Sequence, residues 1–290
     1  MPQTPSVSAS AAVKELSWQE WVKTGDWQST ADAIPMLPSQ AHEIAEIALN
    51  PDVPAIRVSG IVSKDPVLAT AVIQLANSAY SASAIEITSI NEAVVRMGTS
   101  AVRSIVTASC LTSMMADPKV YGSRGRALID HSIGTAYLAR LVADGCGADA
   151  DEMFLAGLLH DIGKLLILKL ASDTVKGVGR PTPEVIEELI LAEHAAFGGF
   201  LVKRWKLPST LEDPIVWHHD PAQATHRPRE ATIVYAANRL AHRYGFGCPR
   251  EEVLLENEPL FAKVRIDERA LAKFDDRAPG LFEIARKIIA

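Results

Sequence analysis

The stretch from Phe154 to Leu166 constrains the fold most, because it places a carboxylate in the middle of an almost wholly apolar predicted helix, FLAGLLHDIGKLL. An ionised Asp161 buried there without a partner would destabilise the fold by several kcal/mol. The sequence offers two compensating cations, a bound metal ion or Lys164, which follows Asp161 at i+3 on the same helix face. The ion pair accounts for Asp161 but gives no reason for His160.

Other histidines fall where a metal site would need them. His131 lies on the preceding predicted helix, His194 on the following one, and His218 with His219 just after the next. Imidazole and carboxylate groups from separate helices are what an inward-facing metal centre in a bundle requires. The sequence therefore predicts a metal site that includes His131, His160, Asp161, His194, His218 and His219.

A structural explanation stays open for each histidine. His131 could be a core residue bonded to a backbone carbonyl, His194 a solvated neighbour of Glu193, and the His218-His219 pair a helix cap. The remaining three, His42, His226 and His242, are interpreted as ordinary surface or packing residues.

Helical periodicity recurs through the chain, and no series of alternating strands is visible, so an all-α fold is predicted. Asp65-Pro66 has the N-cap and first-turn proline that open a helix, and Ser100 begins a comparable segment. Later helices are predicted over Ala127–Ala143, Asp151–Leu170, Glu184–Trp205 and Arg229–Tyr244, with short helices ending in Leu281–Ile289.

A break rich in Asp, Pro and Gly from Asp117 to Gly125 separates two helical subdomains. We predict an N-terminal extension over 1–32, subdomains over 33–122 and 123–245, and a C-terminal helical extension over 246–290. In the first extension Trp18, Trp21 and Trp27 either pack onto the main body, which we favour, or dock a partner. Asn77 is interpreted as a helix C-cap, with a groove-lining role as the alternative.

Composition narrows the class of protein. The 290 residues are 48% hydrophobic and 22% charged, which is typical of a packed globular chain. A net charge of -6 with scattered Lys and Arg disfavours nucleic-acid binding. Cys110, Cys146 and Cys248 form no CxxC pair, and neither a signal-peptide core nor an apolar run of ~18 residues is present. A cytoplasmic protein that does not enter the membrane is predicted.

The histidine pattern resembles the HD superfamily of metal-dependent phosphohydrolases. The span from about Leu37 to Tyr244 more closely resembles its HDOD branch, the HD-related output domains of bacterial signalling proteins. The stretches that carry this resemblance are Lys64–Leu68 leading into Leu75–Tyr80, Ile87–Ile90 with Ala93-Val94 and Met97-Gly98, Phe154–Lys164, and Leu201–Pro208 before the paired histidines. The resemblance implies an all-α bundle of two packed subdomains, the second HD-like.

The sequence departs from that pattern in two places. Asn238 stands where competent HD proteins place a second aspartate, and it offers a neutral oxygen that compensates a divalent ion less well. The Gly-Tyr-Pro signature of the HD-GYP cyclic-di-GMP phosphodiesterases is missing after His219, so turnover of cyclic-di-GMP is not supported.

Two functions follow from the resemblance. The first is a signal-transduction output module that binds a signalling partner or a small ligand and keeps a metal ion in the HD site. The alternative is a metal-dependent phosphohydrolase for a phosphomonoester or nucleotide, in which His131, His160, Asp161 and Asn238 hold one ion, His194, His218 and His219 hold a second, and Lys164 and Asp161 serve catalysis. The ligand set admits iron, manganese, nickel or zinc. The oligomeric state and the identity of the partner stay open.

Overall fold

A computed structural model describes residues 16–30, 53–64, 66–79, 87–114, 119–175 and 178–289. Within these ranges the chain is helical and contains no strand, only an isolated bridge between Val175 and Gly179, which confirms the all-α prediction. The expectations for residues 1–15 and 31–52, and for Asp65 and Tyr80, lie outside the described residues. None of the described helices is long and apolar enough to cross a membrane.

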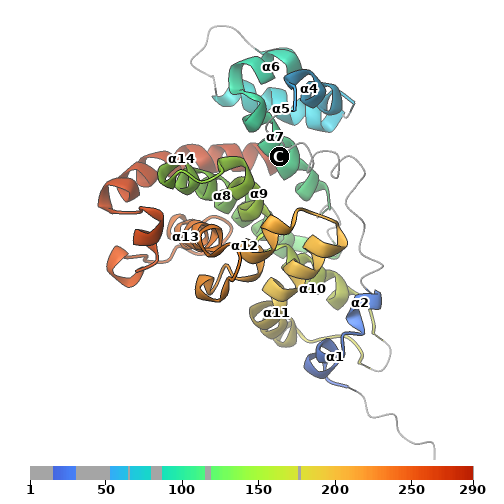
Figure 1. Cartoon of the computed structure of the whole chain (residues 1–290). Helices are drawn as coiled ribbons and strands as arrows, with labels where there is room; N and C mark the ends of the chain where they lie inside the picture. The colour runs from blue at the N-terminus through green and yellow to red at the C-terminus, as the bar shows by residue number, and fades with distance from the viewer. Residues whose placement is uncertain are drawn as a thin grey trace, which may run out of the picture.

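Four helices form a group at one end of the molecule, at the top of Figure 1. They are α4 (Ala55–Val62), α5 (Pro66–Ala79), α6 (Ile90–Met97) and α7 (Thr99–Met114). The predicted helices that open at Pro66 and near Ser100 are therefore confirmed. Helix α7 also contacts α8 and α9, and so connects this group to the rest of the protein.

The Asn77 side chain does not cap a helix, because α5 continues to Ala79. Instead, the backbone N–H of Ile87 donates to Asn77 Oδ1 at 2.7 Å, and Asn77 Nδ2 donates to the Ile87 carbonyl at 2.9 Å. The C-cap prediction is wrong, and the residue instead ties the segment before α6 to α5.

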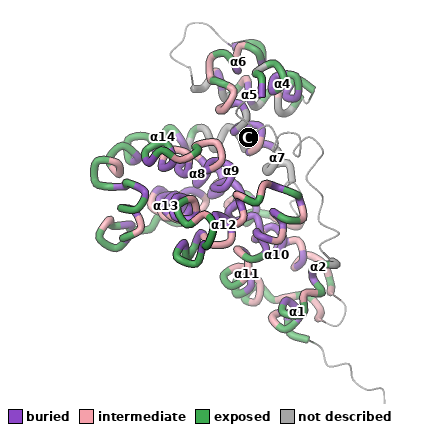
Figure 2. Tube along the Cα trace, viewed as in Figure 1, coloured by how far each residue is buried: buried purple, intermediate pink, exposed green. Residues whose placement is uncertain are grey.

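The second group of helices carries the predicted site. It consists of α8 (Gly122–Cys146), α9 (Ala150–Leu159), α10 (Ile162–Ser172), α11 (Pro183–Arg204), α12 (Glu212–Val216) and α13 (Pro228–Tyr244), with short 3-10 turns at Ser209–Leu211, Pro221–Gln223, Leu255–Asn257 and Phe261–Val264. Helix α8 packs against α9 and α13, and α10 packs against α11. Figure 2 shows that buried residues line α8, α9 and α13, so the core lies between them.

The predicted single helix from Asp151 to Leu170 is two helices, and this expectation is corrected. Helix α9 ends at Leu159, and α10 begins at Ile162. Asp161 has φ -101° and ψ 11°, outside the helical region, so the chain turns at His160-Asp161. Helices α9 and α10 are both buried around most of their circumference, so apolar residues continue across the turn. Nothing in the sequence pattern marks where one helix ends and the next begins.

Gly163 follows that turn and brings α10 against α11. A Cβ atom at this position would lie 1.9 Å from the His194 carbonyl oxygen and 2.6 Å from the Gly198 backbone nitrogen. Only glycine permits this approach, which sets the Asp161 turn beside the helix that carries His194.

The chain ends differently from the prediction of short helices. The last helix, α14 (Glu268–Ile289), runs for 22 residues with Pro279 inside it. Phe274, Ala278 and Leu281 are buried along it, and it contacts α5, α7 and α8. Tertiary packing of this apolar stripe supports a continuous helix in spite of the proline.

The tryptophan-rich segment packs onto the main body, as favoured from the sequence. It forms α1 (Trp18–Thr24), which starts with a capping box between Ser17 and Glu20, and α2 (Trp27–Thr30). The Trp27 ring stacks on Phe197 of α11 with 4.1 Å between ring centroids. Trp18, Trp21 and Trp27 are all buried, so these rings are used inside the fold.

The Gly163 contact predicts a strongly position-dependent effect of alanine. Gly163→Ala should lower the free energy of unfolding by about 1–3 kcal/mol or more, since a methyl group there overpacks a backbone contact. Gly145→Ala is the matched control on α8, where nothing lies within 4 Å, and should raise stability by roughly 0.5–1 kcal/mol. Urea unfolding followed by circular dichroism measures both. Equal effects at the two glycines would contradict the packing argument.

Candidate metal centre

The structure brings the predicted ligands together around the buried side chain of Asp161, between the helices. They are His131 on α8, His160 and Asp161 at the turn between α9 and α10, His194 on α11, His218 and His219 after α12, and Asn238 on α13. All of them are buried except His219, which is exposed. His194 is buried, so its solvated explanation is wrong, whereas His131 is buried and lies 3.1 Å from the Phe246 carbonyl oxygen, as its core explanation expected. That core explanation does not require the cluster.

The Asp161 carboxylate lies between two sets of imidazoles and is 1% exposed. Its Oδ2 atom is 3.3 Å from His160 Nε2 and 3.7 Å from His131 Nε2. Its Oδ1 atom is 3.3 Å from His194 Nε2 and 3.8 Å from His218 Nε2. One carboxylate thus offers one oxygen to each set, which is the arrangement of a bridging ligand.

Backbone carbonyls orient three of the rings. His160 Nδ1 lies 2.7 Å from the Gly157 oxygen, His194 Nδ1 2.5 Å from the Ile190 oxygen, and His218 Nδ1 2.7 Å from the Ile215 oxygen. A carbonyl oxygen can only accept a hydrogen bond, so each Nδ1 carries the ring proton. Burial lowers the pKa of His194 and of His218, so in these two rings Nε2 presents a lone pair toward Asp161, as in histidines that ligate metals.

These lone pairs face one another as well as the carboxylate. His194 Nε2 is 3.3 Å from His218 Nε2 and 3.0 Å from His219 Nε2. Burial lowers the pKa of His194 to about 4 and that of His218 well below its usual value, so protonation does not supply a proton between them near neutrality. His160 Nε2 and Asp161 Oδ1 have no hydrogen-bond partner. Acceptors without a donor, gathered around an anion, fit a bound cation.

Lys164 is the competing cation, and it accounts for only half of the carboxylate. Its Nζ atom donates to Asp161 Oδ2 at 2.6 Å, so the predicted i+3 ion pair is present. The pair leaves Asp161 Oδ1 unexplained, together with the two ring nitrogens near it, His194 Nε2 and His218 Nε2. With His160 and Lys164 nearby, the pKa of Asp161 lies well below its usual value despite burial, so the group is ionised.

His131 differs from the other rings because both of its nitrogens face oxygen atoms. Nδ1 lies 3.1 Å from the Phe246 carbonyl, and Nε2 lies 2.9 Å from Asn238 Oδ1. Burial lowers the pKa of His131 to about 3, so the ring is neutral and has a single N–H to donate. With Asn238 Oδ1 facing the ring, one nitrogen is left facing an acceptor, whichever tautomer is present.

The ligand atoms separate into two groups that could each hold an ion. His131, His160 and Asp161 form one, and His194, His218 and His219 form the other, each with its ligand atoms within 4.8 Å of one another. Asn238 adds its amide to the first group through His131. Imidazole and carboxylate ligands suit zinc, iron, manganese and nickel, and the residues present fit such ions.

A cavity of about 230 Å³ opens beside the centre. Asp161, His131 and Lys164 lie on its wall, Leu128, Leu168 and Ile190 make it largely apolar, and Arg124 pairs with Glu187 across it at 2.7 Å. His242 and Cys248 also line it, although the sequence reading placed neither in a site. His242 follows Asn238 by one helical turn on α13, a spacing that could have indicated it, whereas no sequence signal places Cys248 there.

Comparison with known proteins identifies the family. The HDOD domain matches residues 34–221, well over half of the chain. The chain belongs to the HDOD domain family. The match confirms the resemblance drawn from the sequence motifs and includes every predicted ligand except Asn238.

Individual relatives of this HDOD protein carry varied names. It is 28% identical over 222 residues to an uncharacterized protein of Treponema pallidum, covering 71% of this chain and 42% of that one. It is 32% identical over 119 residues to ribonuclease Y of Thermus thermophilus, covering 41% of this chain and 17% of the ribonuclease. The chain thus spans less than half the length of these two relatives.

Solved structures show the same fold. An HDOD domain protein of unknown function from Geobacter sulfurreducens has a TM-score of 0.72 at 24% identity, covering 92% of this chain and 99% of that one. A proposed metal-dependent phosphohydrolase from Shewanella amazonensis has a TM-score of 0.68 at 20% identity, covering 94% and 98%. At these identities the likeness establishes the fold, and function rests on the site.

The buried neutral histidines predict acid sensitivity of the metal-free protein. Unfolding restores the ordinary His194 pKa of 6.5 from about 4, so below pH 6.5 the unfolded chain binds protons that the folded chain does not. Stability is full above pH 6.5 and should fall by a few kcal/mol as the pH approaches 4. Urea unfolding of metal-free protein across this range measures the slope.

Two variants test the origin of that slope. His194→Gln should reduce the slope, because one titrating group is gone, while His131 and His218, whose pKa values burial also lowers, keep the remainder. His226→Gln, at a side chain that is 85% exposed, should leave it unchanged. A slope that is insensitive to His194→Gln would show that other groups cause the acid sensitivity.

Proposed function

We propose that this HDOD protein is a metal-dependent signal-output module whose HD centre binds divalent ions and, through them, a phosphate-bearing ligand. The observation that carries the proposal is the set of oriented histidine lone pairs around the two oxygens of Asp161. His131 and His160 would hold one ion and His194, His218 and His219 a second, with Asp161 between them.

The charge of the centre supports an anionic ligand. Asp161 is the one carboxylate among neutral imidazoles, so two divalent ions would bring far more positive charge than it offsets. Lys164, on the cavity wall, adds another cation. Phosphate oxygens match such a site in charge and in hardness. The apolar wall formed by Leu128, Leu168 and Ile190 would contact the organic part of the ligand.

Asn238 favours binding over turnover. It places a neutral amide beside His131, where the HD pattern has a second carboxylate. A site with one carboxylate holds its ions less firmly and depends more on the ligand to retain them. Binding that couples a metal and a small anion suits an output module, which reports occupancy to a partner protein.

Phosphoester hydrolysis is the second candidate, favoured by the place of Lys164 on the cavity wall next to Asp161. A bound divalent ion would supply Lewis acidity, polarising a phosphoryl oxygen and acidifying water. Lys164 would then stabilise charge that develops on the phosphoryl group. The relative named ribonuclease and the structural neighbour proposed as a phosphohydrolase support phosphoester chemistry.

Replacing Asp161 tests the metal centre. Asp161→Asn keeps the shape of the side chain but removes the bridging charge, so the variant should lose nearly all bound metal, measured by mass spectrometry on untagged protein. Added manganese at about 100 times its dissociation constant should stabilise the wild type by roughly 2.7 kcal/mol and leave the variant unchanged. Asp220→Asn, at an exposed neighbour of His219, is the control and should retain metal. A folded wild type that takes up no metal would show that Lys164 alone balances Asp161.

Restoring the missing carboxylate separates the two functions. Asn238→Asp should tighten metal binding by roughly tenfold or more, because a carboxylate replaces an amide beside His131. Release of phosphate from a generic aryl phosphate should be near background in the wild type and rise in this variant. Asn257→Asp, on an exposed turn, is the control. Strong hydrolysis by the wild type would favour the enzyme over the output module.

A further inference from the structure

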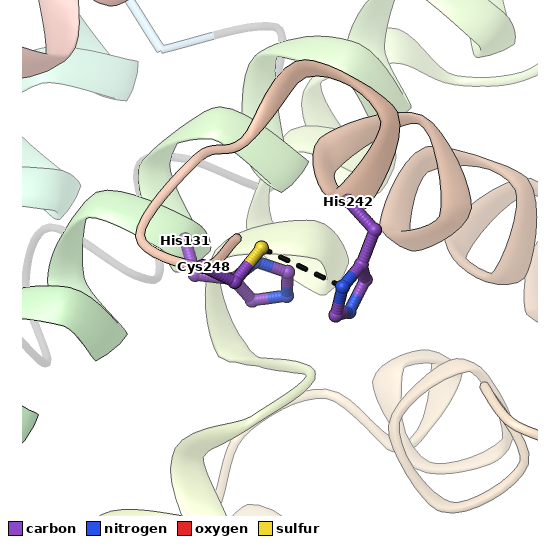
Figure 3. Close-up of side chains that lie close together, drawn as sticks. All are labelled: His131, His242 and Cys248. Carbon is purple, nitrogen blue, oxygen red and sulfur yellow. Dashed lines mark hydrogen bonds between the residues drawn. The ribbon is translucent and has the colours of Figure 1, made fainter. Parts of the chain in front are cut away.

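A second group of potential ligands lies on the other side of His131 from the HD centre. Figure 3 shows the imidazole of His242 and the thiol of Cys248 beside the His131 ring. Cys248 Sγ is 3.5 Å from His242 Nδ1 and 4.0 Å from His131 Nδ1. The three ligand atoms lie within 4.8 Å of one another.

The separations match those of a tetrahedral ion with mixed ligands. With zinc–nitrogen bonds of about 2.0–2.1 Å and zinc–sulfur bonds of about 2.3 Å, two ligand atoms on one ion lie roughly 3.3–3.6 Å apart. The observed distances of 3.5 and 4.0 Å differ from this range by less than roughly half an ångström. The side chains therefore need little movement to bind an ion.

A fourth donor stands next to the group. Glu251 Oε1 lies 2.9 Å from His242 Nδ1, while the other oxygen of the same carboxylate accepts from Arg239 at 2.9 Å. The guanidinium thus holds the carboxylate in place beside His242. Two imidazoles, a thiolate and a carboxylate make a ligand set that zinc prefers.

The contacts of His131 leave room for a cation on this side. Its single proton can serve either the Phe246 carbonyl at Nδ1 or the Asn238 amide oxygen at Nε2. When the proton is on Nε2 and donates to Asn238, the Nδ1 lone pair faces the Phe246 oxygen with nothing between them. A metal ion bound at Nδ1 removes that conflict.

We infer that His131 Nδ1, His242 and Cys248, with Glu251 beside them, form a thiolate-containing site for zinc or a similar borderline metal ion, distinct from the HD centre. The cavity that opens next to Asp161 reaches both His242 and Cys248 and provides the path of entry. Binding is a proton exchange: the Cys248 S–H bond breaks, its proton goes to solvent, and a sulfur–metal bond forms. The proton on His242 Nδ1 moves to Nε2 through solvent, so no oxidant or reductant is required.

The thiolate site shares the His131 ring with the HD centre, so the two sites compete for this ligand. The HD centre uses His131 Nε2 with the proton on Nδ1, and the thiolate site uses Nδ1 with the proton on Nε2. A neutral ring serves one at a time. Zinc in the thiolate site therefore withdraws His131 from the ion shared with His160 and Asp161.

Cobalt(II) titration of the untagged, metal-free full chain tests the site, because a cobalt–thiolate bond gives an intense near-ultraviolet charge-transfer band that nitrogen and oxygen ligands do not give. The wild type should develop this band and reach saturation. Cys248→Ser should abolish it, and His242→Gln should weaken cobalt binding at this site by roughly tenfold or more. Circular dichroism confirms that each variant is folded.

Two controls separate this site from other cysteines and from the HD centre. Cys146→Ser should keep the band, since that buried thiol donates to the Ala143 carbonyl far along α8, a bond that serine retains. Asp161→Asn should also keep the band, because the thiolate site does not use Asp161. A negative result for the thiolate site can therefore be told apart from a negative result for the proposed HD centre. Absence of the band in the wild type, or its persistence in Cys248→Ser, would overturn the inference.

Discussion

The buried charge of Asp161 is the constraint on which the rest of the site depends. The carboxylate is 1% exposed, and Lys164 pairs with only one of its oxygens. The other oxygen lies among imidazole nitrogens that can accept but not donate. An anion surrounded by acceptors is unfavourable without a cation. The helices that pack around Asp161 therefore form a shell suited to a bound cation.

Backbone contacts hold that shell together as much as side chains do. The turn at His160-Asp161 points both residues inward, and Gly163 then lets α10 touch the His194 carbonyl of α11. Gly247 acts similarly on the opposite side: it has φ +62°, and a Cβ there would lie 1.9 Å from the Ala127 oxygen of α8. This contact brings Cys248 next to His131. The glycine on each side sets how closely a ligand-bearing segment can approach.

The sequence was a better guide to which residues form the centre than to how the chain is arranged around it. A carboxylate within an apolar run and histidines on successive helices were enough to select His131, His160, Asp161, His194, His218 and His219, and the structure brings them together. The turn between α9 and α10 left no trace, because buried helices on both sides continue the same apolar pattern. Cys248 was equally hidden, since its neighbours in space are 117 and 6 residues away in the chain. The length of α14 was missed because packing outweighs one internal proline.

Each oriented ring takes its orientation from its own segment of chain. His160 bonds to the carbonyl three residues before it, His218 likewise, and His194 to the carbonyl four residues before it. None of these three rings relies on another ligand to point inward. The centre is consequently modular: a descendant of this protein could lose one imidazole and leave its neighbours correctly aimed. The backbone hydrogen bond of each remaining ring would persist after such a loss.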